Sequence, residues 1–136
     1  MEKERIVVDT NVLVRATFED YGDHQKNLNI LKSYDITLPE VVIYEYFGIL
    51  IEYVNDIDTI YKVINSLELF EIESIKIKDI KEALKMIKEN NKKLNKSNLN
   101  DFILLSIVER LNCSFITYDE DLKKIAKKYN VKVLEL

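Results

Sequence analysis

The chain has 136 residues, of which 47% are hydrophobic, and it contains only two glycines and one proline. This length and composition predict a single ordered domain, residues 1–136, with a sizeable core and no glycine-rich linker. The net charge of −4 gives no general argument for nucleic-acid binding.

The distribution of charged and apolar residues and the single cysteine indicate where the protein is expected to be located. Charged residues open the chain, and no apolar run approaches the length of a membrane span, so neither a signal peptide nor a membrane anchor is expected. A single cysteine, Cys113, cannot form an internal disulfide and suits a reducing compartment. We therefore expect a soluble, cytoplasmic protein.

Short strand-like stretches alternate with helical ones along the chain. Strands are predicted at 6–8, 36–38, 70–75, 114–117 and 131–136. Helices are predicted at 24–34, 40–54, 58–69, 78–88, 102–111 and 119–129, and the polar stretch 90–100 has the composition of a loop. This alternation predicts parallel strands joined by crossover helices, and therefore a three-layer α/β/α sandwich with a central parallel sheet.

The predicted helix 40–54 contains an isolated acid. The helix is apolar nearly all round and is expected to be buried, and Glu45 is the only charged residue between Val41 and Ile51. A buried carboxylate without a partner is costly or takes up a proton. Glu45 is expected either to pair with a distant basic residue, to hydrogen-bond in its neutral form, or to share bound cations with other carboxylates.

Three further acids lie at strand ends and helix starts. Asp9 ends the first strand, Asp101 opens the helix 102–111, and Asp119 follows the strand 114–117. Taken singly, each is explained by helix capping, and Asn98 with Asp101 resembles a capping pair. Ligands of parallel sheets bind outside the carboxyl ends of the strands, where the crossover helices begin. The four acids can therefore converge on one edge, where Mg²⁺ or Mn²⁺ would balance their charge.

Four motifs in this order resemble the PIN domain, a metal-dependent ribonuclease fold. They are "VVDTN" at 7–11, Glu45 in its apolar helix, "NDFILL" at 100–105 and "ITYDEDL" at 116–122. The resemblance runs from Ile6 to about Leu136, and the size and order of the elements are similar to those of the VapC-type toxins within this family.

The resemblance implies a set of site residues. The catalytic, metal-binding acids would be Asp9, Glu45, Asp101 and Asp119, which would bind Mg²⁺ or Mn²⁺. The supporting polar residues would be Asn11 and Thr117. Asp121 is an alternative to Asp119, and Glu40 is a weaker alternative to Glu45. Asp9 is thus expected both to end a strand and to begin a metal site.

The same resemblance implies an endoribonuclease that hydrolyses RNA phosphodiester bonds by a two-metal mechanism, and a VapBC-type toxin with a VapB-like antitoxin as its partner. The alternatives are a stand-alone PIN nuclease in RNA processing and a non-catalytic PIN-like scaffold that binds RNA or protein. A homodimer is also expected. Tyr53 and Tyr61 either serve a homodimer or antitoxin groove or pack in the core.

Other features are less specific. The lysines between 76 and 96 and between 123 and 132 are read either as solvated helix faces or as RNA contacts. The sequence lacks the glycine-rich nucleotide-binding motifs. Its only histidine, His24, is expected at the surface near a helix start, so a nucleophilic Ser or Cys mechanism has no plausible base.

Overall fold

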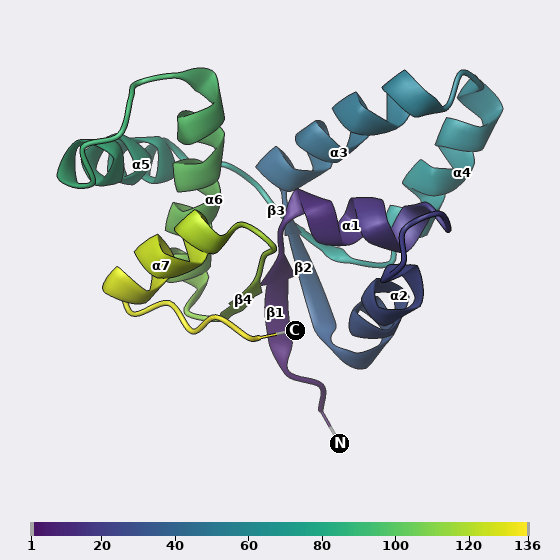
Figure 1. Cartoon of the computed structure of the whole chain (residues 1–136), viewed down its shortest axis with the longest axis horizontal. Coiled ribbons are helices and arrows are strands. Elements are labelled where there is room, and N and C mark those ends of the chain that lie inside the picture. Colours follow the sequence, from purple (N-terminus) through teal and green to yellow (C-terminus); the bar gives the residue numbers. More distant parts are fainter. Residues whose placement is uncertain (1, 136) are drawn as a thin grey trace.

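The computed structural model describes residues 2–135, in which a parallel sheet lies at the centre and helices lie on both sides (Figure 1). The strands are β1 (Arg5–Val8), β2 (Asp35–Pro39), β3 (Glu71–Glu73) and β4 (Ser114–Ile116). The helices are α1 (Thr10–Thr17), α2 (His24–Ser33), α3 (Glu40–Tyr53), α4 (Ile57–Leu67), α5 (Ile77–Glu89), α6 (Lys96–Leu111) and α7 (Glu120–Lys128).

The strand order is β3-β2-β1-β4, and every pairing is parallel. Helices α1 to α4 lie to the right of the sheet in Figure 1, and α5 to α7 lie to the left. The predicted α/β/α sandwich is confirmed. Strand β1 lies at its centre, where Ile6, Val7 and Val8 are fully buried, as the apolar run before Asp9 requires. No helix within residues 2–135 is long and apolar enough to cross a membrane.

The start of α6 differs from the prediction. The helix begins at Lys96, inside the stretch predicted to be a loop, because the side chain of Asn95 caps it by accepting a hydrogen bond from the Asn98 backbone N–H at 2.8 Å. Asp101 consequently lies in the second turn. The interpretation of Asp101 as a helix cap is wrong.

Helix α3 has the predicted bounds to within one residue, but it is not buried all round. Val41, Val42, Tyr46 and Leu50 face the core, whereas Tyr44 is 78% exposed. Tyr53 and Tyr61 are 72% and 61% exposed. Packing of these two tyrosines in the core is therefore contradicted.

The predicted C-terminal strand, 131–136, is reduced to a single bridge between Val133 and Phe115, and Leu136 lies outside the described residues. Phe115 donates its backbone N–H to Lys132 and accepts one from Leu134, both at 2.9 Å. The C-terminal segment is thus held beside β4 at one residue pair.

Candidate metal-binding site

Asp9 lies at the junction of β1, β4 and α1. Its backbone N–H donates to the carbonyl of Ile116 at 2.9 Å, which is the last hydrogen bond of the ladder between β1 and β4. Its side chain caps α1 by accepting the Thr10 N–H at 2.7 Å, and its other oxygen accepts the hydroxyl of Thr117 at 2.6 Å. Burial raises the pKa of Asp9, although these two hydrogen bonds oppose the rise. Asp9 is therefore a cap whose second oxygen points away from the helix.

Glu45 approaches Asp9 from α3. It lies in the second turn of that helix, half-buried, and its Oε1 accepts the hydroxyl of Thr10 at 3.2 Å. Burial raises the pKa of Glu45, and the negative charge of Asp9 adds to the rise. No Lys or Arg within residues 2–135 forms an ion pair with Glu45, so its pairing with a distant base is contradicted.

Asp101 lies among the other acids. The side chain of Asp101 is partly buried, and this burial is the main cause that raises its pKa to about 7. The negative charges of Asp9, Asp119 and Glu45 add to the rise, and Asp121 makes a smaller contribution. Asp9, Glu45, Asp101 and Asp119 therefore lie near one another, and they are called here the acidic cluster. The structure therefore brings the four predicted acids to the carboxyl edge of the sheet.

Thr117 joins two of these acids. It is fully buried directly after β4, and its hydroxyl donates to Asp9 and accepts the backbone N–H of Asp119 at 3.1 Å. Asp119 itself caps α7, accepting the Leu122 N–H at 3.1 Å. Thr117 thus links Asp9 to the segment that carries Asp119.

The remaining candidates lie at the margin. Asp121 is exposed and pairs with Lys92 at 2.7 Å, and Glu40 accepts the backbone N–H of Ile75 at 2.6 Å. Asn11 is exposed in the first turn of α1. The geometry favours Asp119 over Asp121 and Glu45 over Glu40.

Sequence reasoning missed Thr10, whose hydroxyl reaches Glu45. Its position between Asp9 and Asn11 gave a usable signal, because the first residue of a helix that leaves a strand must lie at the same edge as the strand's end.

The donor set fits a hard divalent cation in chemical type, since all four ligands would be carboxylates. None of the four forms an ion pair within residues 2–135, so their charge is uncompensated. In the same part of the chain, no three acidic, histidine or cysteine side chains already lie close enough to hold a metal ion together. Binding would therefore require these side chains to draw closer.

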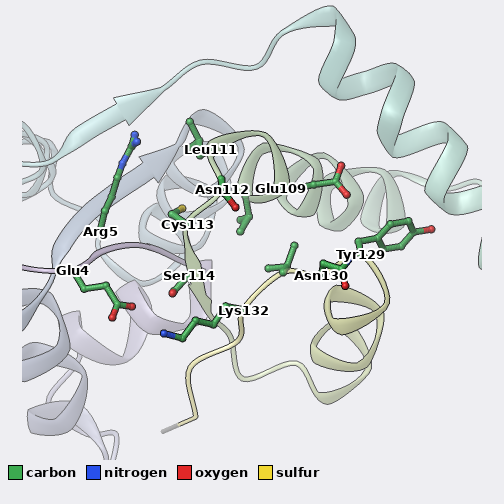
Figure 2. A pocket seen from close by; sticks show the side chains of 12 residues that line it. Glu4, Arg5, Glu109, Leu111, Asn112, Cys113, Ser114, Tyr129, Asn130 and Lys132 are labelled. Carbon is green, nitrogen blue, oxygen red and sulfur yellow. The ribbon is translucent and has the colours of Figure 1, made fainter.

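A separate pocket of about 540 Å³ lies at the opposite edge of the sheet (Figure 2). Its lining includes Arg5 and Ser114, the first residues of β1 and β4, together with Cys113 and Lys132. Because these residues mark the amino ends of the strands, this pocket is distinct from the acidic cluster.

Comparison with known proteins places this geometry in context. A family model described as the PIN domain matches residues 6–128. No curated protein matches the chain in sequence.

Several solved structures have a fold similar to that of this chain. VapBC2 from Rickettsia felis, bound to a DNA fragment from its promoter, has a TM-score of 0.72 and 18% identity, and the match covers 97% of this chain and 98% of that one. FitAcB from Neisseria gonorrhoeae has a TM-score of 0.70 and 16% identity, with 96% of each chain covered. VapC20 from Mycobacterium tuberculosis, described as a sarcin-ricin loop cleaving toxin, has a TM-score of 0.72 and 12% identity, with 88% and 93% covered. At these identities the likeness concerns the fold.

Proposed function

Because the chain belongs to the PIN domain family, we propose that it is a metal-dependent endoribonuclease and that Asp9, Glu45, Asp101 and Asp119 form its catalytic site. We further propose that residues 1–136 act as one domain. The observation that carries the proposal is the convergence of these four carboxylates, none of them ion-paired within residues 2–135, at the carboxyl edge of the sheet.

The four carboxylates would hold Mg²⁺ or Mn²⁺. When bound, such ions supply an activated water and positive charge for the in-line hydrolysis of a phosphodiester. The protein's own groups orient the ligands: Thr10 N–H and the Thr117 hydroxyl fix the two oxygens of Asp9, and the Thr10 hydroxyl fixes Glu45. Asn11, exposed beside Asp9, is available to the substrate.

The proposed partners are RNA as substrate, a VapB-like antitoxin and a second copy of the chain. Among the proteins that share the fold, VapC20 is described as a toxin, and another similar structure is a toxin–antitoxin complex from Klebsiella pneumoniae. Several large apolar side chains stay exposed on α3 and α4, among them Tyr44, Tyr53, Ile57 and Tyr61. Exposed apolar clusters of this kind support a partner-binding surface. We accordingly propose a VapC-type toxin acting in the cytoplasm.

The test is cleavage of end-labelled structured RNA by the purified protein with Mn²⁺, Mg²⁺ or EDTA. We expect metal-dependent cutting that is lost in folded Asp9→Asn and Asp101→Asn variants. Asp58→Asn removes the same charge from the exposed first turn of α4 and should cut like the wild type. Cutting that survives in both site variants would overturn the assigned site.

One observation favours a second candidate, a non-catalytic PIN-like scaffold that binds RNA or protein. The acids of residues 2–135 are not drawn together as a closed ligand set. A scaffold would show neither cleavage of an RNA panel nor a rise in melting temperature with Mn²⁺, whereas a nuclease should show both.

A further inference from the structure

Tyr118 lies between Thr117 and Asp119 in the sequence, and its hydroxyl forms hydrogen bonds to Asn27 of α2. Asn27 of that helix is fully buried, and its amide N–H donates to the Tyr118 hydroxyl oxygen at 2.9 Å. The Tyr118 hydroxyl in turn donates to the amide oxygen of Asn27 at 3.1 Å. The Asn27 amide also donates to the backbone carbonyl of Asp23 at 2.9 Å, which fixes the amide itself. Because its nitrogen and its oxygen both bond the Tyr118 hydroxyl, they fix the position of that hydroxyl.

The ring of Tyr118 is held on its face as well. The guanidinium carbon of Arg15, from α1, lies 4.3 Å from the centroid of this ring, within the range of a cation–π contact. Arg15 is itself fixed by an ion pair with Asp23 at 2.9 Å, and its backbone carbonyl lies 2.9 Å from Nδ1 of His24. The contacts of Arg15 and Asn27 with Tyr118 are named here the Tyr118 clamp.

The clamp acts on a short segment with site residues at both ends. Thr117 points inward and donates to Asp9, while Asp119 turns outward to cap α7. Tyr118 ties the backbone between them to α1 and α2. Since the strand β4 ends at Ile116, the segment 117–119 lies beyond the sheet ladder, and side-chain contacts set its course.

We infer that Tyr118 is a positioning residue that, through the Tyr118 clamp, fixes the course of the segment 117–119 and so keeps Asp119 beside Thr117 and Asp9, from where it would bind the same cation as Asp9. The inference rests on the proposed function. Without the anchor at Tyr118, the segment 117–119 would keep the Thr117 hydroxyl bond to Asp9 but lose its tie to α2, so the Asp119 carboxylate would be placed less firmly relative to Asp9.

The test compares Tyr118→Phe with Tyr129→Phe. Tyr129 offers a matched control: its hydroxyl also accepts an asparagine amide N–H, from Asn90 at 2.9 Å, and it donates to Glu89. Tyr129 lines the pocket at the opposite edge of the sheet, so the same chemical change is made away from the acidic cluster. For each protein, Mn²⁺ affinity is measured by calorimetry. Hydrogen exchange of the peptide spanning 117–119 is followed in EDTA, and melting temperatures are recorded.

The expected result is a Mn²⁺ affinity weakened about tenfold in Tyr118→Phe, the size of effect seen when a group that orients a metal ligand is lost. The 117–119 peptide should exchange faster in Tyr118→Phe without metal. Tyr129→Phe should match the wild type in Mn²⁺ affinity and in the exchange of the 117–119 peptide. The melting temperatures of Tyr118→Phe and Tyr129→Phe should fall by similar, small amounts. RNA cleavage by Tyr118→Phe should return towards the wild-type rate at saturating Mn²⁺.

Equal Mn²⁺ affinity and equal exchange in Tyr118→Phe and wild type would overturn the inference and leave the nuclease intact. Equal weakening in both variants would also overturn it, since the effect would then be a general loss of stability. Absence of Mn²⁺ binding by the wild type would remove the proposed function, and the inference with it.

Discussion

Among the clustered carboxylates, Asp101 shows most directly how their mutual repulsion lowers the stability of the folded protein at neutral and higher pH. Burial and the neighbouring acids raise its pKa to about 7, while the unfolded chain releases the same proton near pH 4. Between these two values the folded state keeps a proton that the unfolded state has lost. Its contribution to the free energy of unfolding is therefore complete below about pH 4 and is lost as the pH rises towards and through 7.

The first prediction concerns Asp101→Asn, which cannot ionise. In EDTA the melting temperature of the wild type should fall between pH 5 and pH 8, and the variant should lose part of that fall and melt higher than the wild type at pH 8. Asp9 and Glu45, whose pKa values are also raised, account for the remainder. Thermal melts across this range provide the measurement. Identical slopes in the two proteins would show that Asp101 is not crowded by negative charge.

Mn²⁺ should remove the advantage in melting temperature that Asp101→Asn has over the wild type at pH 8 in EDTA. A divalent cation relieves the repulsion that destabilises the wild type, so its melting temperature at pH 8 should rise with Mn²⁺, while that of Asp101→Asn should rise little. A variant that is more stable without metal and less responsive to it would distinguish a functional acid from a structural one.

Among the elements, α5 and α6 are joined by the most buried ion pair of the described residues. Arg110 makes two hydrogen bonds of 2.9 Å to the carboxylate of Asp79 and one of 2.7 Å to Glu73, the last residue of β3. Burial alone would raise the pKa of Asp79, but the bonds from Arg110 outweigh it and hold that pKa below its usual value. This pair orients α6, which carries Asp101 in its second turn.

The second prediction is that Arg110→Met lowers the free energy of unfolding by about 3 kcal/mol at pH 7, because it leaves the Asp79 carboxylate buried and unpaired. Lys92→Met, which removes only the more exposed pair with Asp121, should cost less than about 1 kcal/mol. Urea denaturation of the two variants measures both values. The loss of free energy of unfolding in Arg110→Met should become smaller as the pH falls through the pKa of Asp79, because protonation neutralises the unpaired Asp79 carboxylate.

Most element types followed from periodicity and from apolar runs, but the helix α1 (Thr10–Thr17) was not predicted. The order of strands and helices led to the prediction that four acids lie at one edge of the sheet. The start of α6 was not predictable in this way, because Lys96, Ser97 and Asn98 are as polar as the loop before them and only the cap at Asn95 marks the boundary. The exposure of α3 was missed for a related reason. An apolar side chain that faces a partner has the same composition signal as one that faces the core.

The Tyr118 clamp lies beyond sequence reasoning for a different reason. Asn27 and Tyr118 are 91 positions apart, and neither belongs to a periodic pattern. Capping and patterning rules act over a few residues, whereas this contact depends on how α2 packs against the segment after β4. Thr10, one position from Asp9, was in contrast within reach of local rules.

At the scale of the whole molecule, the apolar groove between α3 and β3 bears on assembly. Ile43, Tyr44, Phe47 and Ile72 line it, beside the helix turn that carries Glu45. An exposed apolar surface of this kind suits a two-fold dimer, in which each copy presents the same surface to the other. This position would bring the acidic edges of two copies towards one shared face.

The third prediction is that the purified protein is a dimer in solution and that Tyr44→Glu makes it a monomer, because a charge at the centre of an apolar interface would be buried without a partner. Tyr53→Glu is the matched control: Tyr53 is similarly exposed at the end of the same helix and lies outside the groove lining. Light scattering after size-exclusion chromatography measures the mass of each protein, and unchanged melting of the monomer would confirm that it stays folded. A dimer that persists in Tyr44→Glu and dissociates in Tyr53→Glu would move the interface to the α3–α4 end. A monomeric wild type would contradict self-association altogether and leave the groove to an antitoxin segment or to RNA.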